Sequence, residues 1–141
     1  MTFPLDRPAS DCGPGFRLRQ PGHWPALLKT YSNLLIAGSQ PATDAFLRAA
    51  TPLLRLPVHC IVCEEGLTIS PVARTLILRN VDILTSDEQQ ALARWLDDEP
   101  RPRTQIISQT SAPLYALVQA GAFQEALYYR LNVIYLQVIP D

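Results

Sequence analysis

The sequence has little of what several classes of protein require. Lysine occurs once, at Lys29, and the formal net charge is -1, so the overall charge gives no support to a polyanion-binding surface. No apolar run approaches the roughly 18 residues needed to cross a bilayer. Residues 1–15 contain proline, aspartate and glycine where a signal peptide would need an apolar stretch. We therefore expect a cytoplasmic protein with no membrane partner.

Cysteine is also scarce, and the three residues present are an odd number that does not make a disulfide framework. Cys60 and Cys63 form a C-x-x-C motif beside His59, which leaves a metal or redox site as one interpretation. A zinc site needs four ligands, and the sequence has no second pair at suitable spacing. Because residues 59–63 form an apolar run of strand length, we favour small cysteines buried in a strand. We expect no metal ion and no cofactor.

Hydrophobic residues make up 48 % of the chain, which is enough for one packed domain. Residues 1–22 are rich in proline and glycine and are typical of an N-terminal arm, which leaves residues 23–141 as the core. Beyond the arm, apolar runs of strand length alternate with helix-like stretches. The strand candidates are residues 33–37, 58–62, 75–78, 104–108 and 133–138.

The helix candidates lie between these runs. Thr85 opens the clearest one, because Glu88 follows at the spacing of a capping box and apolar side chains then recur at helical spacing. Residues 42–50 form a second candidate, and residues 113–131 form a third that we expect to break near Gly121. Strands that are apolar on both faces and alternate with helices predict a parallel α/β sheet.

The C-terminal third carries the most distinctive run. Residues 127–133 read LYYRLNV, and they continue a segment that begins at Gly121 with GAFQEA. The LYYRLNV run resembles, residue for residue, the end of the AAA+ core domain of the sigma-54-dependent bacterial transcription activators. The similarity extends in register over about residues 33–138 and is stronger from residue 75 onward. It implies a three-layer, P-loop-NTPase-like core with a five-stranded, mostly parallel sheet.

The departures from this family fall on the residues that handle nucleotide. A phosphate loop follows G-x-x-x-x-G-K-[ST], in which the glycines turn backbone N–H groups toward the phosphates and the lysine reaches the β- and γ-phosphates. The similarity places Gly38, Ser39, Gln40 and Asp44 at former phosphate-loop positions. Asp44 replaces the lysine and puts a negative charge toward the triphosphate. Pro41 removes a backbone N–H donor.

The other nucleotide-handling positions are changed as well. The family ends its third strand with two acids that serve Mg²⁺ and the attacking water, and here the pair is Arg79 and Asn80. Ser111 replaces the family's sensor asparagine. Of two arginines that reach a neighbouring subunit's nucleotide in the family, the first is Gln124 and only Arg130 remains. We expect no ATPase activity and no catalytic residue, with Gln124 and Arg130 as candidate interface residues.

Further parts of the family's activators have no counterpart in the region of similarity. The family carries a long insertion between its second and third strands that touches sigma-54, and here only residues 64–74 join those strands. The similarity ends at the fifth strand, so we expect neither the helical lid nor direct binding of DNA.

The exchanged charges at Asp44 and Arg79 suggest a hypothesis. In a working site the lysine and the acid lie close together, so these two side chains would pair directly and close the old pocket without a ligand. The alternative is that both are independent surface charges.

Three functions remain open at this point. The chain is either a non-catalytic protein-interaction module, serving as an accessory or regulatory subunit in sigma-54-type transcription control, or a ligand sensor, or a divergent activator ATPase. The partner of the first would be an AAA+ activator or a second copy of the chain. The second would bind a small ligand or nucleotide in the old crevice, at the carboxyl ends of the strands. The polar residues expected to converge there are Ser39, Gln40, Asp44, Arg79, Asn80 and Ser111.

Overall fold

The computed structural model describes residues 12–20, 22–98 and 103–141, and its centre is a sheet of seven strands. The strands lie in the order β1-β2-β7-β3-β6-β5-β4, and the last five in this order are parallel. These five are β3 (Leu34–Ala37), β4 (Val58–Val62), β5 (Thr75–Arg79), β6 (Gln105–Thr110) and β7 (Ile134–Pro140). They are the five strands that the apolar runs predicted.

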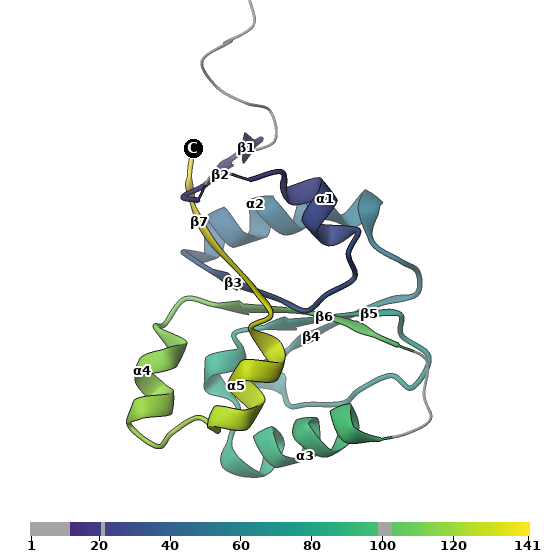
Figure 1. Ribbon diagram of the computed structural model, residues 1–141, viewed down its shortest axis with the longest axis vertical. Helices are drawn as coiled ribbons and strands as arrows, with labels where there is room; N and C mark the ends of the chain where they lie inside the picture. The colour runs from purple at the N-terminus through teal and green to yellow at the C-terminus, as the bar shows by residue number, and fades with distance from the viewer. Residues whose placement is uncertain (1–11, 21, 99–102) are drawn as a thin grey trace, which may run out of the picture.

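Helices cover both faces of the sheet and make a three-layer domain (Figure 1). On one face lie α1 (Trp24–Leu28) and α2 (Gln40–Ala50); on the other lie α3 (Ser86–Asp97), α4 (Leu114–Gln119) and α5 (Glu125–Leu131). Short 3-10 turns occur at Thr51–Leu53, Cys63–Glu65 and Val81–Ile83.

Local sequence explains where these helices begin and end. Both bonds of the predicted capping box form at the start of α3, where the Glu88 N–H donates to Thr85 Oγ1 at 3.2 Å and the Thr85 N–H donates to Glu88 Oε1 at 3.0 Å. The predicted break falls between α4 and α5, where Gly121 takes a left-handed φ of 79°. The sequence therefore placed these helix ends correctly.

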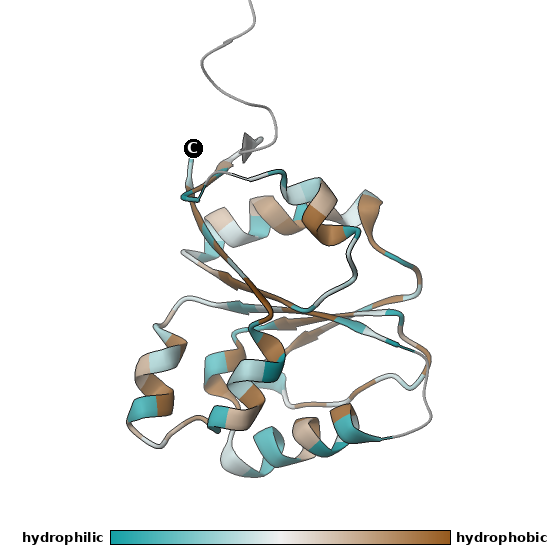
Figure 2. Ribbon diagram, viewed as in Figure 1, coloured by the Kyte–Doolittle hydropathy of each residue, from teal (hydrophilic) through white to brown (hydrophobic). Residues whose placement is uncertain are grey.

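The sheet separates two hydrophobic cores. Most of its strands are brown, the colour of hydrophobic residues, whereas the helices on either side are partly teal (Figure 2). Alternate residues of β3 serve the two cores, because Leu34 and Ile36 pack toward α2 while Leu35 packs toward α3 and α5. The leucines of the LYYRLNV run are core residues, as their helical spacing suggests: Leu127 is 1 % exposed and Leu131 is fully buried.

Part of the segment expected to be an arm belongs to the sheet. β1 (Cys12–Gly13) and β2 (Phe16–Leu18) form an antiparallel pair, and β2 continues the sheet along β7. Phe16 is fully buried, with its ring centroid 5.8 Å from that of Trp24 and 5.3 Å from that of Phe46. The core therefore begins before residue 23, while residues 1–11 lie outside the described part of the chain.

The expectation of two buried cysteines in a doubly covered strand was half wrong. β4 is the edge strand of the sheet, and Cys60 within it is exposed. Cys63 is buried, but it opens the 3-10 turn that follows the strand. An edge strand is covered less completely than a central one, which the apolar run alone could not reveal.

Within the described ranges, no helix is long and apolar enough to cross a membrane, and no helical lid packs beside the sheet. Residues 63–74 connect β4 to β5 and contain a 3-10 turn and no α-helix.

Candidate functional site

The carboxyl end of β3 leads almost directly into α2. β3 ends at Ala37 and α2 begins at Gln40, so only Gly38 and Ser39 connect them. No loop long enough to wrap a phosphate chain remains between these two elements. Pro41 lies in the first turn of α2 and offers no N–H, which removes a further donor from this helix end.

Gly38 has a structural reason to be glycine. A Cβ added there would lie 2.2 Å from the carbonyl oxygen of Val138 on β7. The Gly38 N–H donates to the carbonyl of Thr110 on β6 at 3.1 Å, which holds this residue between the two neighbouring strands. The close approach of β3 and β7 therefore accounts for Gly38 without any phosphate.

Asp44 and Arg79 pair directly, as the exchanged charges predicted. The Arg79 guanidinium on β5 forms an ion pair with Asp44 Oδ1 on α2, and the two side chains are 21 % and 31 % exposed, respectively. Ile77, two residues before Arg79 on the same strand, packs in the core beneath α2, so Arg79 faces the same helix. The alternative of two independent surface charges is wrong.

Asn80 is held by neighbours on both sides. Its backbone is left-handed, with a φ of 58°, a conformation that asparagine tolerates better than most residues. The Asn80 N–H donates to Gln109 Oε1 at 2.9 Å, and Asn80 Nδ2 donates to Glu64 Oε2 at 2.8 Å. Gln109 is fully buried, and its Nε2 has no hydrogen-bond partner among the described residues.

Sequence reasoning missed both partners of Asn80. Gln109 directly follows the predicted strand of residues 104–108 and carries no motif, and Glu64 lies in a connection without a motif. The pairing of β5 with β6 places Gln109 beside Arg79, and this register is a tertiary fact that the local sequence does not state.

The other polar residues expected in the old crevice do not join Asp44, Arg79 and Asn80. Ser39 and Gln40 are exposed at the start of α2, and the Ser39 side chain makes no capping hydrogen bond. Ser111 is exposed just after β6. Of the six polar residues expected to converge, the structure brings Asp44 and Arg79 into contact and ties Asn80 to other partners.

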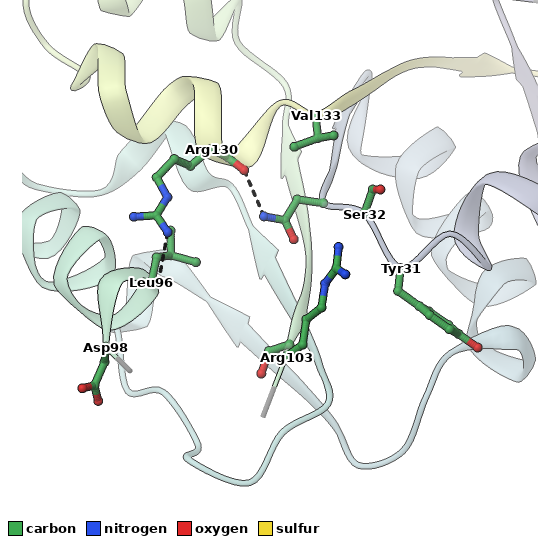
Figure 3. Close-up of a pocket in the computed structure, with 9 residues that line it drawn as sticks. Tyr31, Ser32, Leu96, Asp98, Arg103, Arg130 and Val133 are labelled. Carbon is green, nitrogen blue, oxygen red and sulfur yellow. Dashed lines mark hydrogen bonds between the residues drawn. The ribbon is translucent and has the colours of Figure 1, made fainter. Parts of the chain in front are cut away.

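Arg130 is engaged within the chain. Its guanidinium pairs with Asp97 at the end of α3. It also donates to the Leu96 carbonyl at 3.0 Å (Figure 3). A cavity of about 380 Å³ lies beside it, into which Arg103 points from the other side. Gln124 precedes α5, and its N–H donates to Gln89 Oε1 at 2.8 Å. The interface role of Arg130 and Gln124 stays a prediction.

Burial disfavours the thiolate form of both cysteines of the C-x-x-C motif. Burial raises the pKa of the Cys63 thiol to about 12, with a smaller contribution from the nearby carboxylate of Glu64. Burial also raises the pKa of Cys60. His59 Nδ1 accepts a hydrogen bond from the Ser70 N–H at 3.2 Å. The described residues contain no group of three or more histidine, cysteine or acidic residues that could hold a metal ion.

The five parallel strands, covered by helices on both faces, define a three-layer α/β domain with a cluster of polar side chains at the carboxyl ends of its strands. The family model named Sigma-54 interaction domain matches residues 53–140, and the chain belongs to this family. No curated protein matches it.

The chain is also similar in fold to structures of NtrX from Brucella abortus. Against the complex of NtrX with ATP the TM-score is 0.68 at 22% identity, covering 82% of this chain and 35% of NtrX. Against the complex with ADP the TM-score is 0.67 at 23% identity, covering 82% and 33%. Another NtrX structure gives 0.62 at 20% identity, covering 80% and 34%. The chain thus spans about a third of the length of the NtrX chains that it matches.

Proposed function

We propose that this chain is a non-catalytic Sigma-54 interaction domain, which acts by binding another protein and does not turn over ATP. The observation that carries the proposal is the ion pair between Asp44 and Arg79. Phosphoryl transfer depends almost entirely on positioning and on stabilising negative charge around the phosphates. In this chain the cation at the site, Arg79, is already paired with the carboxylate of Asp44.

The surrounding residues offer little to replace the lost chemistry. The connection of Gly38 and Ser39 supplies no phosphate-wrapping loop, and Pro41 supplies no N–H donor. Asn80 stands in place of an acid, and its Nδ2 donates to Glu64, so it offers Mg²⁺ a neutral amide oxygen in place of a carboxylate charge. These features support a site that binds neither the metal ion nor the triphosphate.

The divergent-ATPase alternative would need a new acid, and Glu64 is the carboxylate that contacts Asn80. It is exposed on the 3-10 turn after β4. If nucleotide turnover were detected, Glu64→Gln would be the first variant to examine. The sensor alternative at the old crevice loses support, because the polar residues assigned to it pair with one another or lie apart.

Exposed apolar side chains on the α5 side of the sheet support a role in protein interaction. Tyr129 on α5 is 56% exposed, and Val133, which lies between α5 and β7, is 59% exposed. The Tyr129 ring lies 5.2 Å from that of Tyr128 between centroids, and contiguous exposed apolar surface marks contact sites on many soluble proteins. A catalytically competent member of the Sigma-54 family, or a second copy of this chain, is the partner that the proposal names.

Calorimetric titration with millimolar ATP and ADP in the presence of Mg²⁺ tests the catalytic half of the proposal. We expect no binding heat from the natural chain, and no phosphate released from ATP in a separate turnover assay. A matched control is the doubly substituted chain with Asp44→Lys and Arg79→Asp, which restores the family's charge arrangement. Saturable binding to the natural chain that Glu64→Gln or Asp44→Ala alters would overturn the proposal.

The interaction half needs a separate measurement. The chain is mixed with a purified Sigma-54 activator that has an intact ATPase, and both the sedimentation of the mixture and the activator's ATPase rate are followed. We expect a complex and a changed rate, both weakened by Tyr129→Ser. Val72→Ser is the control, because it also removes an exposed apolar side chain, 68% exposed, but Val72 lies between β4 and β5. The absence of any complex of the chain with an activator or with itself would refute this half.

A further inference from the structure

A second cavity of about 390 Å³ lies at the carboxyl edge of the sheet, beneath α4 and α5. Leu35 forms part of its floor, and three tyrosines from different elements form much of its wall: Tyr115 from α4, Tyr128 from α5 and Tyr135 from β7. We call it the tyrosine cavity. Its volume is within the range of small-molecule sites in proteins. It lies across the sheet from the Asp44–Arg79 ion pair, which is on the α2 side.

The wall of the tyrosine cavity is built from contacts that hold the rings in place. Leu35 of β3 and Tyr135 of β7 are register partners, so both side chains face the layer of α4 and α5. The rings of Tyr115 and Tyr128 lie 5.5 Å apart between centroids. Asn132 Nδ2 donates to Tyr128 Oη at 3.0 Å, which fixes Tyr128 and leaves Asn132 Oδ1 as an acceptor at the cavity.

Among the residues that the structure describes, no lysine, arginine or histidine lines the tyrosine cavity. Arg130, the basic residue of α5, is directed to the end of α3 and paired there. The hydroxyl of Thr110, which does line the cavity, donates to Asp82 Oδ1 at 3.0 Å, so a carboxylate lies directly behind the wall. A carboxylate or phosphate ligand would find no cation here.

We propose that the tyrosine cavity binds a small organic cation of the quaternary ammonium class. Aromatic rings attract such cations electrostatically, and the attraction grows when water is excluded. Asn132 Oδ1 would accept a hydrogen bond from a hydroxyl carried by the ligand. This site uses none of the nucleotide-handling positions, and the proposal does not rest on the absence of ATPase activity.

The test is a titration of the isotope-labelled full chain with choline, followed by amide shifts in NMR spectra. The matched probe is 3,3-dimethylbutan-1-ol, which has the same shape but a carbon in place of the charged nitrogen. We expect saturable shifts at Tyr115, Tyr128, Asn132 and Tyr135, with choline bound about fivefold or more tighter than the neutral alcohol.

Two substitutions separate the attraction of the ring from simple contact. Tyr135→Leu keeps an apolar wall but removes the aromatic face, so choline affinity should fall about fivefold while that of the alcohol is unchanged. Tyr135→Phe keeps the ring and should retain choline. Tyr31→Phe, at a distant tyrosine, is the control. Equal affinity for the two probes would show an ordinary apolar pocket and overturn the proposal, as would shifts located elsewhere or no binding at tens of millimolar choline.

Discussion

The ion pair between Asp44 and Arg79 gives the most direct test of how this domain is held together. It joins α2 to the end of β5 above the buried core formed by residues such as Ile77. With exposed fractions of 21 % for Arg79 and 31 % for Asp44, the pair is neither a surface contact nor fully enclosed. Removal of one partner leaves the other charge partly desolvated.

The size of the effect follows from that exposure. Exposed ion pairs contribute about 0.2–1 kcal/mol, whereas removal of one partner from a fully buried pair costs about 3–5 kcal/mol. For a pair between these limits we expect Asp44→Ala to lower the free energy of unfolding by about 2 kcal/mol. Arg79→Met should lower it by about 1–2 kcal/mol, because it leaves a carboxylate that water reaches more easily.

The doubly substituted chain distinguishes a true pair from two unrelated charges. If the side chains interact, Asp44→Ala with Arg79→Met should cost about 2 kcal/mol in total, which implies a coupling energy of about 1–2 kcal/mol. The exchanged variant, Asp44→Arg with Arg79→Asp, should recover part of the loss. Urea denaturation followed by circular dichroism measures the natural chain and the four variants, provided that the dependence of the unfolding free energy on urea concentration has the same slope in each. Single costs that add to within about 0.5 kcal/mol would refute the reasoning.

Three other predictions test how the chain is packed. Gly38→Ala should destabilise the chain by about 2 kcal/mol or more, because the new Cβ would lie 2.2 Å from a backbone oxygen of Val138. Gly66→Ala is the control and should cost about 1 kcal/mol in the same urea assay, because its Cβ meets nothing within 4 Å and adds only the strain of a positive φ. Phe16→Ala should cost about 3–5 kcal/mol, since Phe16 is fully buried between two aromatic rings; a loss below about 1 kcal/mol would mean that β2 is dispensable. The pKa of Cys63 is raised to about 12, which leaves about one in ten thousand of its thiols ionised at pH 8. In a Cys12→Ser background, Cys63 should therefore react with a thiol reagent only after the chain unfolds. Labelling of native Cys63 faster than of the exposed Cys60 would contradict that assignment.

Much of the fold was readable from local patterns. The capping box at Thr85 located α3, and the alternation of apolar runs with helical stretches predicted the five parallel strands. These signals work because each is satisfied within a few residues of chain. The pairing of Asp44 with Arg79 was also predictable, since two aligned positions carried opposite charges exchanged in sign.

Contacts between distant segments escaped this kind of inference. The burial of Phe16 against Trp24 and Phe46 depends on β2 adding to β7, and the proline and glycine around it suggested only a loose arm. The exposure of Cys60 depends on β4 lying at an edge of the sheet. An apolar run indicates that a strand is suited to burial, but it does not show whether the strand lies at the centre or at the edge of the sheet.

The sequence by itself determined the five parallel strands, most of the helices and the family, because each of these is written in local spacing and side-chain chemistry, and it predicted that Asp44 pairs with Arg79. Only the tertiary structure decided how the rest of the chain is arranged around them. It added β1 and β2 to the sheet, gave Asn80 the partners Glu64 and Gln109, and assembled the tyrosine cavity from α4, α5 and β7. The physical reason is that strand order and register set these distances, and both arise from packing the whole chain at once.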